Sequence, residues 1–311
     1  MQYEQPLATL GVAVRRLEWV PQTTRDVARL TTRLLRDARG SDVVVLLKPR
    51  LHPAILEMLR RVNPRLVVDI DDAVWTWNPV FGERFDRSAR VARAISTGSQ
   101  YLADATARRH PDTIVERIPT AVDTERYPVR DASPASRPPV VGWIGNTASL
   151  GDFSDEIVGA LAKLSTDGAA RLRVVSSRSL DRPELTSEFE PWSLATEVES
   201  LRRFDVGIMP LDDDEQARGR CGLKAIQCMA VGVPVVASPV GAATEIITDG
   251  VDGFFASTER EWYDTLSDLV ASDERRSAIG VRARRRVEDE YSVTANVGRL
   301  HALLRRVADG T

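Results

Sequence analysis

The sequence is poor in cysteine, histidine and lysine, and these shortages exclude several kinds of site. Cys221 and Cys228 lie seven positions apart on one predicted helix, too far apart for a disulfide, so we expect small buried thiols in a reducing compartment. The three histidines are scattered, and no Cys/His spacing resembles a zinc site. The only lysines are Lys48, Lys163 and Lys224. A lysine within a motif therefore stands out from the arginine background.

Long apolar runs and a strong net charge are also missing. No stretch of about 18 apolar residues occurs and no signal-peptide pattern opens the chain, which predicts a cytosolic protein. Arginines between residues 84 and 93 are compatible with peripheral contact at the inner face of a membrane, although Glu83 and Asp86 interrupt them. The net charge of −3 provides no general attraction for nucleic acid, so no such partner is expected.

Segments of strand and helix character alternate along the first part of the chain. A short opening helix is followed by a predicted strand over 12–20 and a helix through 27–35, for which Thr23 fits the N-cap. A continuous apolar run at 43–47 is typical of a strand buried on both faces. A helix over 55–62 and a strand over 66–70 complete a βαβ series. The series predicts an α/β fold with a parallel, doubly wound sheet.

The alternation stops between residues 119 and 139, where prolines, serines and charges indicate an interdomain linker. It restarts with strands over 140–144, 172–176, 206–210 and 235–238. We therefore expect two Rossmann-like domains that face a cleft. The amino-terminal domain covers residues 1–130 and is completed by the last helix, at about 293–311. The carboxy-terminal domain covers 131–292. Ligands of such sheets bind at the carboxyl ends of the strands.

The amino terminus departs from this scheme. A doubly wound domain normally opens with a central strand and a glycine-rich turn, and both are absent here. Two explanations stay open. The sequence starts downstream of the true start, which we favour, or the first sheet is genuinely reduced and lacks its first strand.

The most informative segment is the run from Arg218 to Gly241. It is typical of a glycine-rich loop, a short helix, a Gly-Val-Pro turn, a buried strand and a second glycine turn. Arg220, Lys224 and Gln227 have i, i+4, i+7 spacing and are predicted to share one face of the helix. A cationic face at a helix start beside a strand end suits a phosphorylated ligand.

In order and spacing, several motifs resemble the GT-B glycosyltransferases of the retaining glycosyltransferase family 4 type. They are Asp69-Ile-Asp-Asp-Ala73, Ile118-Pro-Thr-Ala-Val-Asp123, Gly142-Trp-Ile-Gly145, Pro191-Trp192, Asp205-Val-Gly-Ile-Met-Pro-Leu211, Gly222 to Gly241, Asp249-Gly-Val-Asp-Gly-Phe254 and Val287-Glu-Asp-Glu-Tyr-Ser292. The resemblance implies a metal-independent enzyme without a cofactor. It would move a sugar from a nucleoside-diphosphate-sugar donor to a saccharide or lipid-linked acceptor, with retention of configuration.

The expected donor site lies in the carboxy-terminal domain. Lys224 and Arg220 would stabilise the departing diphosphate, and the alternative for both is a solvated helix face. Gly145 and Asn146 are predicted to form a turn whose backbone amides could bind a phosphate. Trp192 would flank the base and Glu245 would contact the sugar. Gly222 and Gln227 belong to the same expected set.

The expected acceptor site centres on the carboxylates after residue 70. Asp71 and Asp72 would orient the acceptor hydroxyl or take its proton, with Trp75 and Trp77 as candidate lining residues. Asp69, Asp71 and Asp72 also form an Asp-x-Asp pattern of the kind that holds a divalent ion. No metal is expected here, because the resemblance implies metal-free catalysis.

One departure from the family pattern leaves alternatives open. Family members usually carry two glutamates around the short helix of the Arg218–Gly241 run, and the matching positions here are Gly219 and Gln227. A glutamine can hydrogen-bond a hydroxyl but supplies no carboxylate. A non-catalytic, nucleotide-sugar-binding remnant is therefore the main alternative to the enzyme. An NDP-sugar epimerase is a further one, although the histidines are poorly placed for it.

Overall fold

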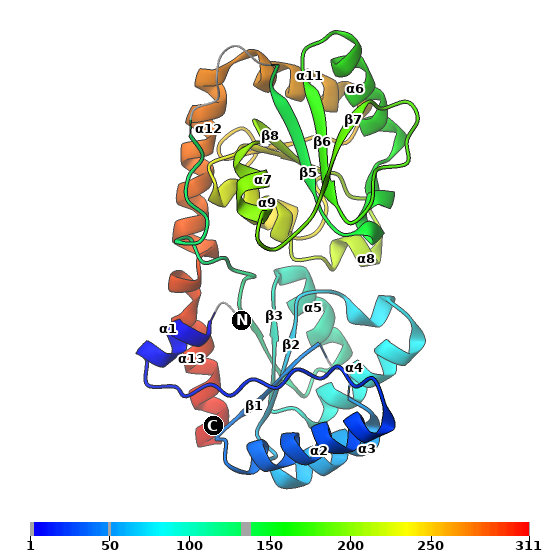
Figure 1. Cartoon of the computed structure of the whole chain (residues 1–311). Coiled ribbons are helices and arrows are strands. Elements are labelled where there is room, and N and C mark those ends of the chain that lie inside the picture. Colours follow the sequence, from blue (N-terminus) through cyan, green and yellow to red (C-terminus); the bar gives the residue numbers. More distant parts are fainter. Residues whose placement is uncertain (1–2, 49–50, 132–137, 311) are drawn as a thin grey trace. The chain divides into compact units, whose positions relative to one another are not determined.

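The computed structural model describes residues 3–48, 51–131 and 138–310 (Figure 1). It divides into two compact units. Unit 1 comprises Met1–Thr120, Arg218–Cys221 and Asn296–Thr311, and unit 2 comprises Ala121–Ala217 and Gly222–Ala295. The division lies between Thr120 and Ala121, whereas the linker composition had placed it after residue 130.

Unit 1 contains a parallel sheet in the order β1-β2-β3-β4. Its strands are β1 (Val44–Leu47), β2 (Leu66–Ile70), β3 (Ala94–Thr97) and β4 (Ile114–Arg117). They are joined by α3 (Pro53–Val62), α4 (Pro79–Val91) and α5 (Gln100–Arg109), with η1 (Val74–Thr76) after β2. Each crossover leads to the next strand in the same direction. The described part of this sheet therefore has no reversal of strand order, unlike a doubly wound sheet.

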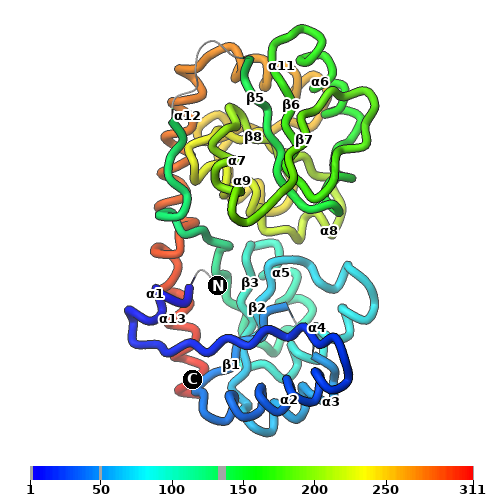
Figure 2. The backbone as a smooth tube through the Cα atoms, in the orientation of Figure 1, coloured from blue at the N-terminus to red at the C-terminus, as the bar shows by residue number. Residues whose placement is uncertain are grey.

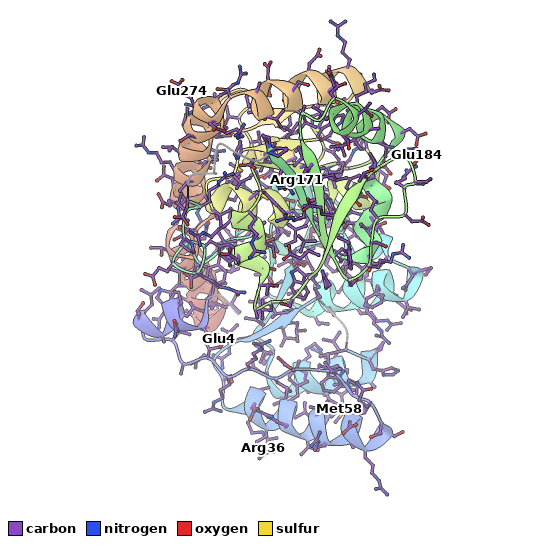
Figure 3. The ribbon with its side chains drawn as sticks, turned by 45° about the horizontal axis from the view of Figure 1, so that its top comes forward. Glu4, Arg36, Met58, Arg171, Glu184 and Glu274 are labelled. Atoms are coloured by element: carbon purple, nitrogen blue, oxygen red, sulfur yellow. The ribbon has the colours of Figure 1, made fainter. Side chains whose placement is uncertain are left out.

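Helices cover both faces of the unit 1 sheet. Leu66 packs with α2 (Thr24–Arg39) and α3, whereas Val67 packs with Leu303 and Val307 of the last helix, α13 (Val293–Asp309). The alternation of these neighbours follows from the pleat of β2. Thr23 caps α2 in a capping box with Asp26, as predicted. The polar side of α2, which carries the exposed Arg36, faces away from the sheet (Figure 3).

The strand predicted over 12–20 is wrong. After α1 (Glu4–Thr9) this segment pairs with no described strand, and Figure 2 shows it as a drawn-out dark-blue trace in unit 1. Trp19 packs against the buried cluster around Leu59, but Val14 and Val20 are exposed, so the segment does not bury one face as a strand would. An apolar pattern without a partner strand cannot form a ladder.

Unit 2 contains six parallel strands in the order β10-β9-β8-β5-β6-β7. They are β5 (Val140–Ile144), β6 (Arg171–Ser176), β7 (Ser187–Pro191), β8 (Val206–Met209), β9 (Val235–Ala237) and β10 (Phe254–Phe255). The order reverses between β5 and β8. This is the topology of a doubly wound, Rossmann-like sheet, in which ligands bind at the carboxyl ends of the strands where the order reverses. The predicted α/β class with parallel sheets is confirmed.

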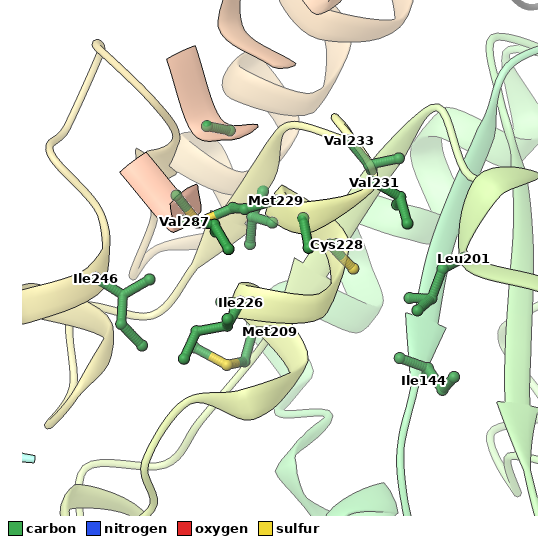
Figure 4. Packing of buried hydrophobic residues seen from close by; sticks show 14 of the residues in the cluster. Ile144, Leu201, Met209, Ile226, Cys228, Met229, Val231, Val233, Ile246 and Val287 are labelled. Atoms are coloured by element: carbon green, nitrogen blue, oxygen red, sulfur yellow. The ribbon is translucent and has the colours of Figure 1, made fainter. Parts of the chain in front are cut away.

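The two faces of the unit 2 sheet have separate cores. Val141 and Trp143 of β5 pack with α6 (Asp155–Thr166) and α11 (Glu259–Ala271). Ile144 packs on the opposite face with α7 (Glu197–Arg202) and α9 (Leu223–Ala230), as Figure 4 shows for Ile144, Leu201 and Ile226. The remaining elements are η2 (Thr147–Asp152), α8 (Glu215–Arg218, whose last residue lies in unit 1), α10 (Ala243–Ile246), α12 (Asp273–Arg286) and the π-helical turn η3 (Val287–Tyr291).

Both cysteines are buried and free, as expected. Burial raises the pKa of the Cys228 thiol to about 12, and burial likewise raises the pKa of Cys221. In the part of the chain that the structure describes, no helix has the length and hydropathy needed to cross a membrane.

A glycine in β5 makes room for Phe204 on the face of the unit 2 sheet that α7 and α9 cover. A Cβ on Gly142 would overlap the ring of Phe204, which is fully buried. We expect Gly142→Ala to lower the free energy of unfolding by about 1–3 kcal/mol through overpacking. Urea unfolding followed by tryptophan fluorescence measures this loss. Gly151→Ala is the matched control, because nothing lies within 4 Å of its added Cβ. Equal midpoints for the two variants would contradict the assignment.

A half-buried carboxylate makes the stability of unit 1 depend on pH. Asp69 of β2 pairs in register with Ser96 of β3, whose hydroxyl donates to its Oδ1 at 2.5 Å. Burial raises the pKa of Asp69 to about 6, against the effect of that hydrogen bond. A raised folded-state pKa means that this carboxyl favours folding below about pH 4 and loses that contribution as pH rises through 6.

We therefore expect Asp69→Asn to flatten this part of the stability profile. The difference in unfolding free energy between variant and wild type should grow in favour of the variant between pH 4 and 7, by up to about 3 kcal/mol. Parallel urea titrations at each pH measure the difference. A difference that is constant with pH would show that Asp69 has an ordinary pKa.

Candidate functional site

The switch point of the unit 2 sheet, where the strand order reverses, lies at the carboxyl ends of β5 and β8. Gly145 and Asn146 follow β5, and the Gly145 amide donates to the Val175 carbonyl of β6 at 3.0 Å. Leu211 follows β8, and its amide donates to Ser238 Oγ, after β9, at 3.0 Å. Asn146 caps η2 by accepting a hydrogen bond from the Ser149 amide. Hydrogen bonds from backbone amides therefore fix the chain after β5 and after β8, the two strands between which the order reverses.

Lys224 lies beside Gly145 at this switch point. A Cβ on Gly145 would be 2.7 Å from the Trp143 ring and 2.8 Å from Lys224 Cε. Lys224 Nζ lies 4.7 Å from the centroid of the Trp143 ring, close enough for a cation–π interaction. The missing side chain at residue 145 therefore leaves the space through which the lysine reaches the strand end. This places a positive charge next to exposed backbone at the switch point of the sheet.

The interpretation of Arg220, Lys224 and Gln227 as one helical face is wrong. Helix α9 begins at Leu223, after Gly222 with a left-handed φ of 65°, so Arg220 lies outside the helix. Glycine is suited to this left-handed conformation, which prevents the helix from extending back to Arg220. The segment Arg218–Cys221 belongs to unit 1, where Gly219 packs against Ala73 and Arg220 favours the charged form of Asp72.

Gln227 does lie on α9 but is only 7% exposed, because this helix is buried from Ala225 to Ala230. Its Nε2 donates to Tyr127 Oη at 3.0 Å, so its amide serves an internal contact. Trp192, directly after β7, is 45% exposed. Glu245 is half-buried on the short helix α10, and its carbonyl accepts hydrogen bonds from Arg286 and Tyr291.

Unit 1 carries a second charged cluster at its strand ends. Lys48, after β1, places Nζ 2.8 Å from both Asp71 Oδ1 and Asp72 Oδ2, which follow β2. Its backbone has a φ of 49°, the only positive value among the described residues other than glycine. Such a conformation is costly for lysine and persists only where surrounding contacts enforce it. Sequence reasoning missed this role of Lys48, and the available signal was a rare lysine directly after an apolar run. That run was expected to be buried on both faces, but in β1 Val45 and Leu47 are exposed.

The protonation of this cluster follows from burial and charge. Burial raises the pKa of Asp72, and the neighbouring Asp71 charge adds to the rise, while Lys48 and Arg220 oppose it. Burial acts to lower the pKa of Lys48, but the two carboxylates outweigh it and the pKa rises. Lys48 therefore stays charged and occupies the position where a cation bridging the two aspartates would lie. Among the described residues, no group of three or more His, Cys, Asp or Glu side chains is arranged to hold a metal ion.

The two tryptophans near these aspartates have different surroundings. The Trp77 ring lies 5.5 Å from Lys48 Nζ and so belongs to the cluster. Trp75 packs on Phe85, with ring centroids 5.3 Å apart, as part of a buried apolar cluster.

Comparison with known proteins relates this chain to glycosyltransferases. Residues 138–272 match the family model of glycosyl transferases group 1. A D-inositol 3-phosphate glycosyltransferase of Stackebrandtia nassauensis is 27% identical over 267 residues, which cover 76% of this chain and 58% of that protein. The protein of the same name from Nocardia farcinica is 27% identical over 197 residues, covering 54% and 42%. The chain thus spans about half the length of these relatives.

Solved structures extend the likeness to the whole fold. A glycosyltransferase from Rickettsia africae superposes with a TM-score of 0.71 at 12% identity, covering 99% of this chain and 88% of that one. Anabaena HepE, solved with UDP and glucose, gives a TM-score of 0.68 at 14% identity, covering 97% and 89%. The matched family segment contains β5, β8 and Lys224, the parts that meet at the strand reversal of unit 2. Residues 138–272 are therefore similar to the group 1 glycosyltransferases, and the chain has the GT-B fold.

Proposed function

We propose that this protein transfers a sugar from a nucleoside-diphosphate-sugar to an acceptor hydroxyl, with retention of configuration and without a metal ion or cofactor. The observation that carries the proposal is the position of Lys224 beside Gly145, at the strand reversal of unit 2. The switch point of a doubly wound sheet is where the phosphates of nucleotides bind. The relatives are named glycosyltransferases, and HepE was solved with UDP, which makes UDP-sugars the first donors to test.

In this proposal Lys224 acts on the leaving group. Negative charge grows on the diphosphate as the bond to the sugar breaks, and a fixed cation stabilises that charge more in the transition state than in the ground state. The Gly145 amide is engaged with Val175, so the amides that follow it in the turn would bind the same phosphates. The departing phosphate could itself accept the proton of the acceptor hydroxyl, so no protein nucleophile is required.

The unit 1 cluster would serve the acceptor. Asp72 is a better proton acceptor than an exposed aspartate, because burial raises its pKa. Lys48 holds both carboxylates in place through its ion pairs. The acceptor is proposed as a saccharide or lipid-linked hydroxyl. The names of the relatives make D-inositol 3-phosphate a specific compound to include in the test.

The proposal is tested by release of nucleoside diphosphate from a panel of UDP-, GDP- and ADP-sugars, with and without candidate acceptors and with EDTA present. Acceptor-dependent release and a product with the donor's anomeric configuration, read by NMR, would support it. Binding of donors without any transfer or hydrolysis would support the remnant instead. Loss of activity in EDTA that manganese restores would overturn the metal-free part.

Removing the charge at residue 224 should affect chemistry more than binding. We expect Lys224→Met to reduce kcat by about 10²–10³ and to raise the donor KM by less, because the lysine acts mainly on charge that develops in the transition state. Steady-state kinetics measure both constants. Lys163→Met is the matched control, since Lys163 is exposed on α6 of the same unit and pairs with Glu259. An unchanged kcat for Lys224→Met would remove the central role of this residue.

Filling the space at residue 145 should disturb the same candidate site without removing a charge. Gly145→Ala would push its Cβ against the Trp143 ring and Lys224 Cε. We expect UDP affinity to fall by roughly 10-fold or more as the lysine is displaced. Titration calorimetry with UDP measures it, with Gly151→Ala as the control. Wild-type affinity in Gly145→Ala would show that this turn does not approach the phosphates.

A further inference from the structure

A chain of hydrogen bonds in unit 2 connects the buried side of α9 with the exposed Trp192. Gln227 Nε2 donates to Tyr127 Oη at 3.0 Å, and Tyr127 Oη donates to Glu197 Oε1 at 2.8 Å. Trp192 Nε1 donates to the other carboxylate oxygen, Glu197 Oε2, at 3.1 Å. The first three residues are buried, with exposed fractions of 7% for Gln227, 1% for Tyr127 and 8% for Glu197.

The direction of these bonds is set by the number of protons available. Tyr127 has one hydroxyl proton, and burial together with the Glu197 charge raises the pKa of Tyr127 to about 12, so the proton is retained. That proton goes to Glu197, which as a carboxylate can only accept. The residue at position 227 must then donate to Tyr127 Oη. A glutamine amide can donate, whereas an ionised glutamate would place a second buried acceptor against the same oxygen.

The chain ends at an aromatic surface of defined position. Trp192 directly follows β7, and its amide donates to the Ser176 carbonyl at the end of β6. Because β5, β6 and β7 are neighbours, the Gly145 turn and Trp192 are separated by two strand spacings, or about 10 Å. This separation suits the distance between the phosphates and the base of one nucleotide. An indole with its N–H fixed and its ring exposed can stack on a base.

We propose that Glu197, Tyr127 and Gln227 are positioning residues that hold Trp192 as a stacking surface for the nucleobase of the donor, and that Glu197 determines why position 227 is glutamine. The ligand assignment rests on the proposed function. The coupling between positions 197 and 227 does not, because it follows from the hydrogen bonds alone. Gln227 is therefore assigned to this internal chain, and no contact with the donor sugar is needed to explain it.

The coupling is tested by stability measurements on a reciprocal exchange. In the wild-type background, Gln227→Glu should lower Tm by about 5 °C, because two buried carboxylates compete for one proton. In the Glu197→Gln background the same change should cost little. There Tyr127 donates to the new carboxylate at position 227, and the new amide at position 197 donates to Tyr127 while accepting from Trp192, so every group is satisfied. Equal costs of Gln227→Glu in both backgrounds would overturn the coupling.

The positioning role is tested by comparing a ligand that has a base with one that lacks it. Glu197→Ala should weaken UDP binding by about 10-fold and leave inorganic pyrophosphate binding unchanged, measured by titration calorimetry. Glu197→Gln, which still accepts from the indole, should restore UDP affinity. Trp192→Leu should show the same selective loss as Glu197→Ala.

The outcomes separate the inference from the function on which it rests. Equal weakening of UDP and pyrophosphate in Glu197→Ala would show a general structural defect and overturn the positioning role. Unchanged UDP affinity in Trp192→Leu would overturn the stacking surface. Failure of the wild-type protein to bind either ligand would instead contradict the proposed function, while the stability result for positions 197 and 227 would still decide the coupling.

Discussion

The absence of one side chain, at residue 145, is the constraint on which the candidate donor site depends. Trp143 and Lys224 occupy the space that a Cβ would need, so the lysine reaches the end of β5 only because that residue is glycine. The reversal of strand order between β5 and β8 places this strand end at the switch point of the sheet. The charge and the backbone amides meet there because both rely on the same small volume. A change in either the turn or the lysine affects the other.

The second unit was easier to predict from the sequence than the first. Continuous apolar runs such as Val140–Ile144 are strands in the structure because they are buried on both faces. In the first unit, β3 has only four residues, Ala94–Thr97, with two hydroxyl side chains, and it gave no comparable signal. The segment 12–20 carried an apolar pattern but found no partner strand. Pattern alone does not state whether a neighbouring strand exists.

The sequence indicated candidate residues but not the contacts that surround them. Lys224 and Gly145 do lie together, because a motif constrains residues that are close in the fold. The helical spacing of Arg220 was misleading, since Gly222 breaks the helix just before Leu223. The ion pairs of Lys48 were missed, because the βαβ pattern predicts that the two strands are neighbours but not where the side chains at their ends point. A positive φ at a lysine is likewise invisible in sequence.

The burial of both native thiols has a practical consequence. Cys221 and Cys228 are the only cysteines in the chain, and burial raises the pKa of each, so the reactive thiolate is scarce at neutral pH. Native protein should thus leave maleimide reagents largely unreacted. A single cysteine introduced on an exposed surface of either unit would then be the main site for a fluorophore. The unmodified chain already offers a clean background for distance measurements by fluorescence.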